Sequence, residues 1–121
     1  MNSTEFSVDR RDIRFVQKEF LQVQQLAKLP GYKDFSESDF DLVVEEGNTF
    51  VEQVLAPLNK LGDEQMSKLV NGQVVTPKGF KEAWKKAAES GWMGITAPAE
   101  FGGQALPLSV AIGTLESFYT D

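Results

Sequence analysis

Apolar residues recur at the spacing of an α-helix in four stretches of this chain, and proline or glycine separates the stretches. The first stretch runs from about Arg10 to Lys28, with Asp9 able to cap its start and Pro30-Gly31 ending it. Its apolar stripe consists of Ile13, Val16, Phe20, Val23 and Ala27. This organisation predicts an all-α fold, a small bundle of about four main helices.

The second helix is expected to begin near Ser36, which stands three residues before Asp39 as in a capping box. Its apolar face includes Gly47, which costs about 1 kcal/mol of helix propensity relative to alanine, so we expect a neighbouring helix to approach closely there. Pro57 cannot donate the backbone hydrogen bond of a helix interior. The helix should therefore kink or restart at Pro57, and it can continue to Leu61 before Gly62.

A short hairpin or β-turn is expected at Asn71-Gly72, because this dipeptide stands between two short β-prone segments, residues 68–70 and 73–75. The segments are too short to form a ribbon that is stable by itself.

The third helix is predicted to have Thr76 as its N-cap and Pro77 in its first turn, and to end at Gly91 in the left-handed conformation. Its stripe consists of Phe80, Ala83, Trp84, Ala87 and Ala88. The fourth helix begins near Pro107, and an apolar stripe recurs on one side of it, made of Leu108, Ala111, Ile112, Leu115 and Tyr119.

The composition excludes several classes of site. The chain has no cysteine, which excludes a disulfide framework and a thiol nucleophile, and no histidine, the commonest general base. A net charge of −6 argues against nucleic acid as the main partner. The sequence contains no transmembrane segment of 18 apolar residues. We therefore expect a cytoplasmic protein without nucleic-acid or metal sites.

The pair Gly102-Gly103 could cradle a phosphate, but it lacks the spacing of the known phosphate loops. A tight loop that lets Phe101 and Leu106 pack is the favoured interpretation. Trp84 is expected in the core. Trp92 and Phe101 could stack on a flat ligand or anchor the loop in the core, and the second interpretation is favoured. Neighbouring carboxylates such as Glu45-Glu46 fall on predicted polar faces, and Glu116 projects away from the apolar stripe of its helix.

Three stretches resemble the acyl-CoA dehydrogenase family. The segment Gly91–Pro107, GWMGITAPAEFGGQALP, is similar to the family pattern GW-x-G-…-P-x-E-[FY]-G-G-Q-x-L-P. Residues 54–63, VLAPLNKLGD, and residues 75–83, VTPKGFKEA, resemble two stretches of the family's N-terminal part in the same order. Residues 11–16 are similar to an extension in longer bacterial members, which include enzymes acting on 3-methylthiopropionyl-CoA. Ala105 departs from the pattern, since glycine is common there.

The resemblance implies the N-terminal helical domain of a three-part flavoenzyme. In that family a glutamate removes the α proton of an acyl-CoA, FAD accepts a hydride from the β carbon, and an electron-transfer flavoprotein receives the electrons. The decisive residues lie in later domains, so no catalytic, cofactor-binding or metal-binding residue is carried over. The one candidate is a loop on the pocket side, made of Pro98, Phe101, Gly102 and Gly103.

We therefore expect residues 1–35 to form an N-terminal extension helix and residues 36–121 an incomplete acyl-CoA dehydrogenase N-terminal domain, the two making one folded unit. As a part of a larger enzyme, the chain by itself should bind no FAD and have no activity. It should also self-associate through open apolar stripes. The alternative is a stand-alone helical module that binds a partner protein without catalysis.

Overall fold

The computed structural model describes residues 6–120. These residues form five α-helices, several short 3₁₀- or π-helical segments and one two-stranded hairpin, so the all-α expectation is confirmed. Residues 1–5 of the predicted extension, and Asp121, lie outside the described residues. No helix in residues 6–120 is long and apolar enough to cross a membrane.

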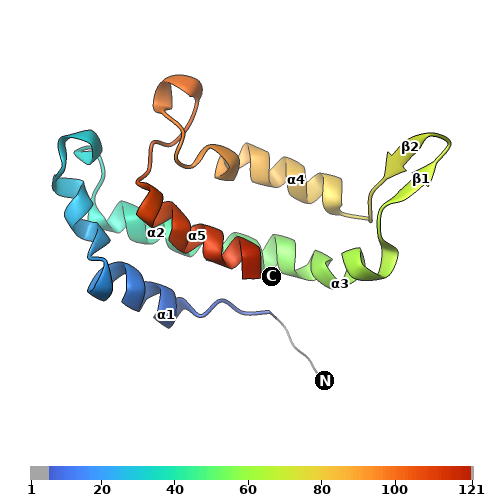
Figure 1. Cartoon of the computed structure of the whole chain (residues 1–121), viewed down its shortest axis with the longest axis horizontal. Helices are drawn as coiled ribbons and strands as arrows, with labels where there is room; N and C mark the ends of the chain where they lie inside the picture. Colours follow the sequence, from blue (N-terminus) through green and yellow to red (C-terminus); the bar gives the residue numbers. More distant parts are fainter. Residues whose placement is uncertain (1–5, 121) are drawn as a thin grey trace.

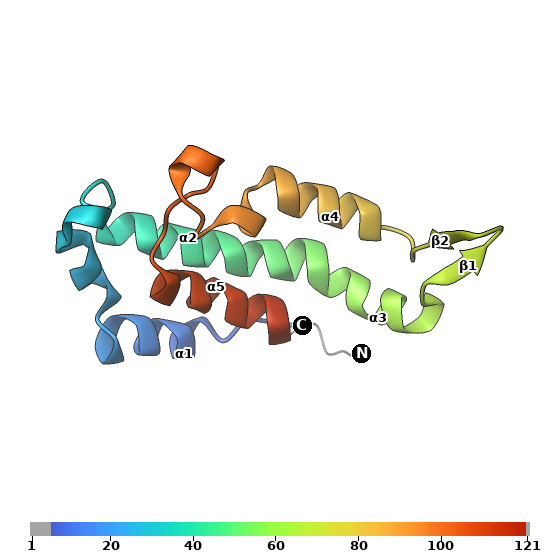
Figure 2. The same cartoon turned by 45° about the horizontal axis from the view of Figure 1, so that its top comes forward.

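The longest element of the fold is a nearly continuous helix made of α2 (Glu37–Phe50), a π-helical segment (Val51–Leu55) and α3 (Ala56–Gln65) (Figures 1 and 2). Ser36 and Asp39 form the predicted capping box at its start. The π-helical segment ends two residues before Pro57, which cannot donate the α-helical hydrogen bond. The helix does not end before Gly62, however, but continues for one more turn to Gln65.

The predicted continuous helix over residues 10–28 is wrong. The chain forms α1 (Arg10–Arg14) and a π-helical segment (Phe15–Phe20), and it then bends at Gln22 before the 3₁₀ segment Val23–Lys28. Gln22 has φ 53°, a left-handed conformation that no regular helix contains. The wider π turn also places Gln17, and not Val16 or Phe20, against the body of the protein. As predicted, Asp9 accepts a hydrogen bond from the backbone N–H of Asp12 at 3.0 Å.

The hairpin consists of β1 (Lys68–Val70) and β2 (Gln73–Val75), which are antiparallel with Leu69 opposite Val74. Asn71 and Gly72 form its turn, both with positive φ (50° and 77°), as the sequence predicts. The hairpin extends from the end of the helical body, and both of its faces are exposed (Figure 1).

Helix α4 (Phe80–Glu89) begins three residues later than predicted. Its N-cap is Gly79 with φ 91°, and neither Thr76 nor Pro77 starts it. Pro77 is buried and lies in the turn that precedes the helix, where its carbonyl accepts a hydrogen bond from the N–H of Phe80. Trp84 is 65% exposed, so its predicted place in the core is also wrong.

Helix α5 (Leu108–Thr120) begins after Pro107, as predicted, but the side that it buries is not the one that its apolar stripe occupies. The buried side consists mainly of small residues: Val110, Ala111, Gly113, Thr114 and Ser117. The larger side chains of Leu108, Ile112 and Tyr119 are 62%, 53% and 85% exposed. The small residues let α5 approach α2 closely, and a Cβ added to Gly47 would collide with the Thr114 methyl group. The close approach predicted at Gly47 is therefore present.

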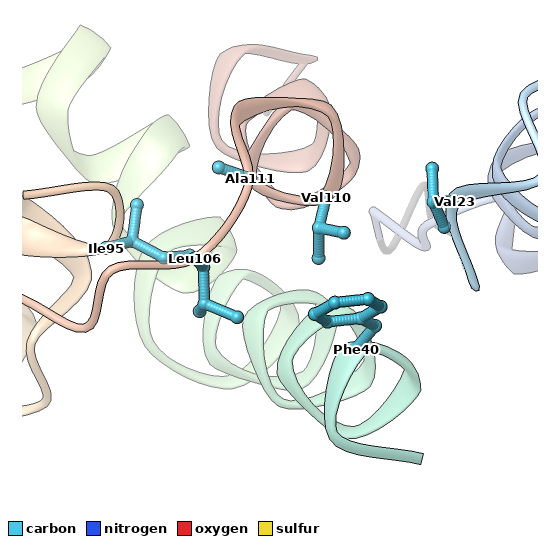
Figure 3. Packing of buried hydrophobic residues seen from close by; sticks show 6 residues of the cluster. All are labelled: Val23, Phe40, Ile95, Leu106, Val110 and Ala111. Atoms are coloured by element: carbon cyan, nitrogen blue, oxygen red, sulfur yellow. The ribbon is translucent and has the colours of Figure 1, made fainter. Parts of the chain in front are cut away.

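The hydrophobic core lies where α2, α5 and the segment before α5 meet (Figure 3). Phe40 of α2 and Val110 of α5 are almost fully buried, at 1% and 0% exposure. A buried hydrogen bond of 2.6 Å from the Ser117 hydroxyl to the Asn48 side-chain oxygen joins the same two helices further along. The core cluster consists of Val23, Phe40, Ile95, Leu106, Val110 and Ala111.

Candidate functional site

The loop between α4 and α5, residues 91–107, folds back on itself through backbone hydrogen bonds. The N–H groups of Gln104, Ala105 and Leu106 donate to the carbonyl oxygens of Gly94, Ala97 and Ile95 at 2.9–3.1 Å. The loop begins at Gly91, which has φ 82° and ends α4 as predicted. These bonds give the loop one defined shape without a regular sheet.

The tip of the loop is a tight turn and not an anion site. The N–H of Gly102 donates to the carbonyl of Ala99, and the N–H of Gly103 donates to the carbonyl of Pro98, both at 3.0 Å. Because both donors are already used within the turn, they do not converge on empty space as a phosphate cradle requires. A Cβ at Gly103 would collide with the backbone carbonyl of Ala97, so the close backbone approach requires glycine there.

The structure separates the two aromatic residues of the loop. Trp92 is half-buried and packs with Phe50 and Phe118, with ring centroids 6.0 and 5.9 Å apart. It therefore plugs the loop into the helices, as expected. Phe101 is 79% exposed at the tip, which contradicts its predicted packing, while Leu106 is buried. The tight turn directs the Phe101 ring away from the body of the protein.

The four loop residues proposed from the sequence stay close together but border none of the three cavities described for residues 6–120. Pro98, Phe101 and Gly102 are exposed, and Gly103 is half-buried. Whether the loop touches a ligand therefore stays a prediction.

The largest of the three cavities described for residues 6–120 is an apolar groove that the sequence analysis did not identify. It has a volume of about 590 Å³ and lies between α4 and the long helix, with Lys81 as its one charged lining residue. Trp84 and Met93 are exposed beside it, at 65% and 57%. The signal in the sequence is the apolar stripe of α4, but helical spacing alone cannot say whether a core or an open groove faces such a stripe. The apolar lining consists mainly of Leu55, Leu58, Phe80, Trp84, Met93 and Phe118.

Charged groups gather on the opposite side of α2, where it meets the N-terminal arm, defined here as residues 6–20. The guanidinium of Arg10 donates to Glu52 at 2.6 and 2.9 Å and to Glu45 at 2.8 and 3.0 Å. The Arg10 hydrogen bonds, together with one from the N–H of Val8, lower the pKa of Glu52 against the opposing effect of burial. Glu52 is therefore part of a tertiary contact.

A second basic residue of the arm binds the same face of α2. The ammonium group of Lys18 donates to Glu37 and to Asp41. Burial by itself lowers the pKa of Lys18, but the hydrogen bonds to Asp41 and Glu37 outweigh it, so this pKa lies above its ordinary value. In residues 6–120 no three acidic side chains come close enough together to hold a metal ion.

Comparisons with known proteins agree with the order of the sequence motifs. The family model of the acyl-CoA dehydrogenase N-terminal domain matches residues 38–118. The chain is 35% identical over 106 residues to 3-methylmercaptopropionyl-CoA dehydrogenase of Ruegeria pomeroyi, covering 88% of this chain and 18% of that protein. It is 35% identical over 85 residues to a butyryl-CoA dehydrogenase of Syntrophomonas wolfei, covering 67% of this chain and 14% of that protein.

The chain thus spans less than a fifth of the length of these curated relatives. The matches do not favour the alternative of a stand-alone interaction module. The family model covers the long helix, the hairpin, α4, the loop and most of α5. The chain belongs to the acyl-CoA dehydrogenase N-terminal domain family.

Proposed function

We propose that this chain is the N-terminal helical domain of an FAD-dependent enzyme that removes two hydrogens across Cα–Cβ of an acyl-CoA thioester. The observation that carries the proposal is the family match over residues 38–118. The names of the relatives support the substrate class, since both are dehydrogenases of CoA thioesters. Transfer of the electrons to an electron-transfer flavoprotein and a cytoplasmic location are further parts of the proposal.

We also propose that residues 1–35 are an extension and residues 36–121 the family domain, and that both fold as one unit. The start of the family match at residue 38 supports this boundary. The ion pairs between the arm and α2 support a single unit, since they join the two parts through Arg10 and Lys18.

The described residues do not fit FAD by themselves. FAD carries two phosphates and a flat ring system, so its site needs N–H or cationic donors beside an apolar slot. The apolar groove offers only Lys81 as a charged group, and the N–H groups of Gly102 and Gly103 already donate within their turn. We therefore place the flavin and the catalytic base outside residues 6–120.

The role proposed for this domain is to support and enclose the site. The apolar groove and the outward stripe of α5 (Leu108, Ile112 and Tyr119) expose hydrophobic surface to solvent, which is unfavourable. We propose that other domains of the enzyme cover them, and that the chain alone self-associates for the same reason. The loop residues Pro98, Phe101, Gly102 and Gly103 are proposed to border the ligand, because the exposed Phe101 ring is held on a rigid turn.

The test uses the protein made from the complete coding frame that contains these residues. We expect it to purify with bound flavin, and anaerobic butyryl-CoA should bleach the flavin absorbance whereas butyrate should not. A flavin that no acyl-CoA reduces would refute the proposed activity.

A second preparation, the 121-residue chain mixed with FAD, tests where the cofactor binds. We expect no flavin absorbance to stay with the chain after gel filtration. Stoichiometric retention of flavin would refute the claim that the site lies outside this domain.

The loop proposal is tested with Phe101→Ala in the complete protein. We expect a higher KM for acyl-CoA, because Phe101 is proposed to border the ligand. The flavin content should stay unchanged, because Phe101 belongs to none of the three described cavity walls and not to the core cluster. An unchanged KM would refute the proposed place of this loop.

A further inference from the structure

The N-terminal arm is attached to the body of the protein mainly by polar contacts. Arg10 bridges Glu45 and Glu52, which stand two helical turns apart on the long helix. Lys18 bridges Glu37 and Asp41, one turn apart near the start of α2. Both pairs of carboxylates are therefore spaced along one face of the helix, and each basic side chain of the arm reaches both members of its pair.

One further polar contact joins the arm to α5. The side-chain amide of Gln17 donates to the backbone carbonyl of Ser109 at 2.6 Å. Gln17 is 6% exposed, and its amide nitrogen lies 2.6 Å from the position that a Cβ at Gly113 would take. The arm thus contacts both α2 and α5, and Figure 2 shows α1 running beside α5.

Apolar packing under the arm is sparse. Ile13 is the one buried hydrophobic residue among residues 6–20, whereas Phe15 and Phe20 are 52% and 75% exposed. A cavity of about 320 Å³ separates the arm from α2, and its walls include Phe40 and Asn48. Both of these residues are 1% exposed, so the arm and its neighbours shield them from solvent. Their side chains nevertheless do not fill the cavity between the arm and α2.

The arm also ends at a natural bend. Gln22 follows the π-helical segment and has φ 53° and ψ 48°, a left-handed conformation in a residue other than glycine. A change in the φ and ψ angles of Gln22 would redirect the whole arm, whereas Val23 is fixed in the core at 4% exposure. Hinges of this kind consist of a few residues between rigid segments.

We propose that the arm is an ionic strap that opens and closes about Gln22 over the cavity between the arm and α2. When closed, Arg10 and Lys18 hold it to the acidic face of α2. When these contacts break, the arm leaves as a unit and opens the cavity, with Phe40 and Asn48 on its wall, while α2, α5 and the rest of the core stay folded. This inference does not depend on the proposed enzymatic function.

The test is hydrogen exchange of backbone amides in the 121-residue chain, followed by mass spectrometry, at low and high salt. The variant Arg10→Gln/Lys18→Gln breaks both bridges and keeps most of each side chain's bulk. We expect its amides in residues 10–20 to exchange about tenfold faster at low salt, and those in residues 110–117 to change less than about twofold. Raising the salt from about 0.05 M to about 1 M should speed the arm of the native chain toward the variant's rate.

The matched control is Arg11→Gln/Lys28→Gln, which removes the same charge from two exposed residues that make no ion pair within residues 6–120. It should leave exchange in the arm unchanged. The proposal fails if this control speeds the arm as much as the test variant, because the effect would then be one of net charge. It also fails if the arm and residues 110–117 speed up together, or if neither changes.

A second variant guards against an effect on folding in general. Arginine at position 18 keeps the charge and can still reach both carboxylates. In the variant Arg10→Gln/Lys18→Arg, the exchange rate of the arm should therefore lie between that of the native chain and that of Arg10→Gln/Lys18→Gln. Exchange as fast as in the double variant would show that the charge of residue 18 does not hold the arm, and it would overturn the proposal.

Discussion

Gly47 lies against Thr114, and one methyl group of Thr114 decides whether replacing Gly47 by alanine raises or lowers the stability of the protein. In an isolated helix, replacing Gly47 by alanine would stabilise the protein by about 1 kcal/mol, because alanine has the higher helix propensity. In this fold the added Cβ collides with the Cγ2 methyl of Thr114. Overpacking of this kind costs about 1–3 kcal/mol. Gly47→Ala should therefore be neutral to destabilising by up to about 2 kcal/mol, the difference between these two estimates.

The substitution Thr114→Ser removes the colliding methyl and keeps the hydroxyl group. The next atoms around the added Cβ, the Thr114 Cβ and Oγ1, lie at 3.2 Å, which small shifts can accommodate. Thr114→Ser alone should cost about 1 kcal/mol for the lost buried methyl. In that background Gly47→Ala should become stabilising by up to about 1 kcal/mol, so the coupling between the two sites should be about 1–3 kcal/mol.

The assay is urea unfolding of the four proteins of this cycle, followed by far-UV circular dichroism. Glu46→Ala is the control, because Glu46 is exposed beside Gly47 and its effect should be the same in the native and the Thr114→Ser backgrounds. Equal effects of Gly47→Ala in both backgrounds would refute the inference that the Thr114 methyl sets the approach of α5 to α2.

Other predictions follow from single contacts. Gly103→Ala should destabilise the chain by about 1–3 kcal/mol in urea, because its Cβ meets the Ala97 carbonyl, a backbone group that cannot rotate away. Ala105→Gly should instead stabilise it by less than about 1 kcal/mol, because Ala105 has φ 54° and glycine relieves that strain at some cost in unfolded-state entropy. Glu52→Gln should lower stability at neutral pH and lose its effect in acid: the pKa of Glu52 is lowered on folding, so its contribution is present above the unfolded value, about 4.3, and disappears as the pH falls through the folded value. Urea midpoints between pH 2 and 7 measure this convergence, and a constant difference would contradict it. Trp84→Ser should reduce the proposed self-association in sedimentation velocity, because Trp84 is the largest exposed side chain beside the apolar groove; a monomeric parent chain at high concentration would contradict the premise.

Features that depend on neighbouring residues were readable in the sequence. The Ser36–Asp39 capping box, the Asn71-Gly72 turn and the left-handed Gly91 all formed as predicted. Each is set by hydrogen bonds or backbone preferences within a few residues, so the local sequence contains the whole cause. The family was readable for a related reason, since the spacing of the glycines and prolines in residues 91–107 reflects one loop shape.

Features that depend on distant partners were not readable in the same way. The exposed aromatic ring of Phe101 and the groove beside Trp84 depend on which surfaces meet, and an apolar residue at helical spacing does not say whether anything covers it. The ionic contacts of the arm were missed because Arg10 and Glu52 are 42 residues apart, and charges on predicted polar faces are ordinarily solvated.

Helix α5 shows the division most clearly. Its sequence by itself determined that residues after Pro107 form a helix, through local propensity and apolar periodicity. Only the tertiary structure decided which side is buried. Gly47 on α2 leaves room for a close neighbour, and the small side of α5 around Thr114 and Ser117 fits there, so Leu108 and Ile112 face outward. Shape complementarity between two helices prevailed over the greater hydrophobicity of the other face, because close packing requires both surfaces to fit.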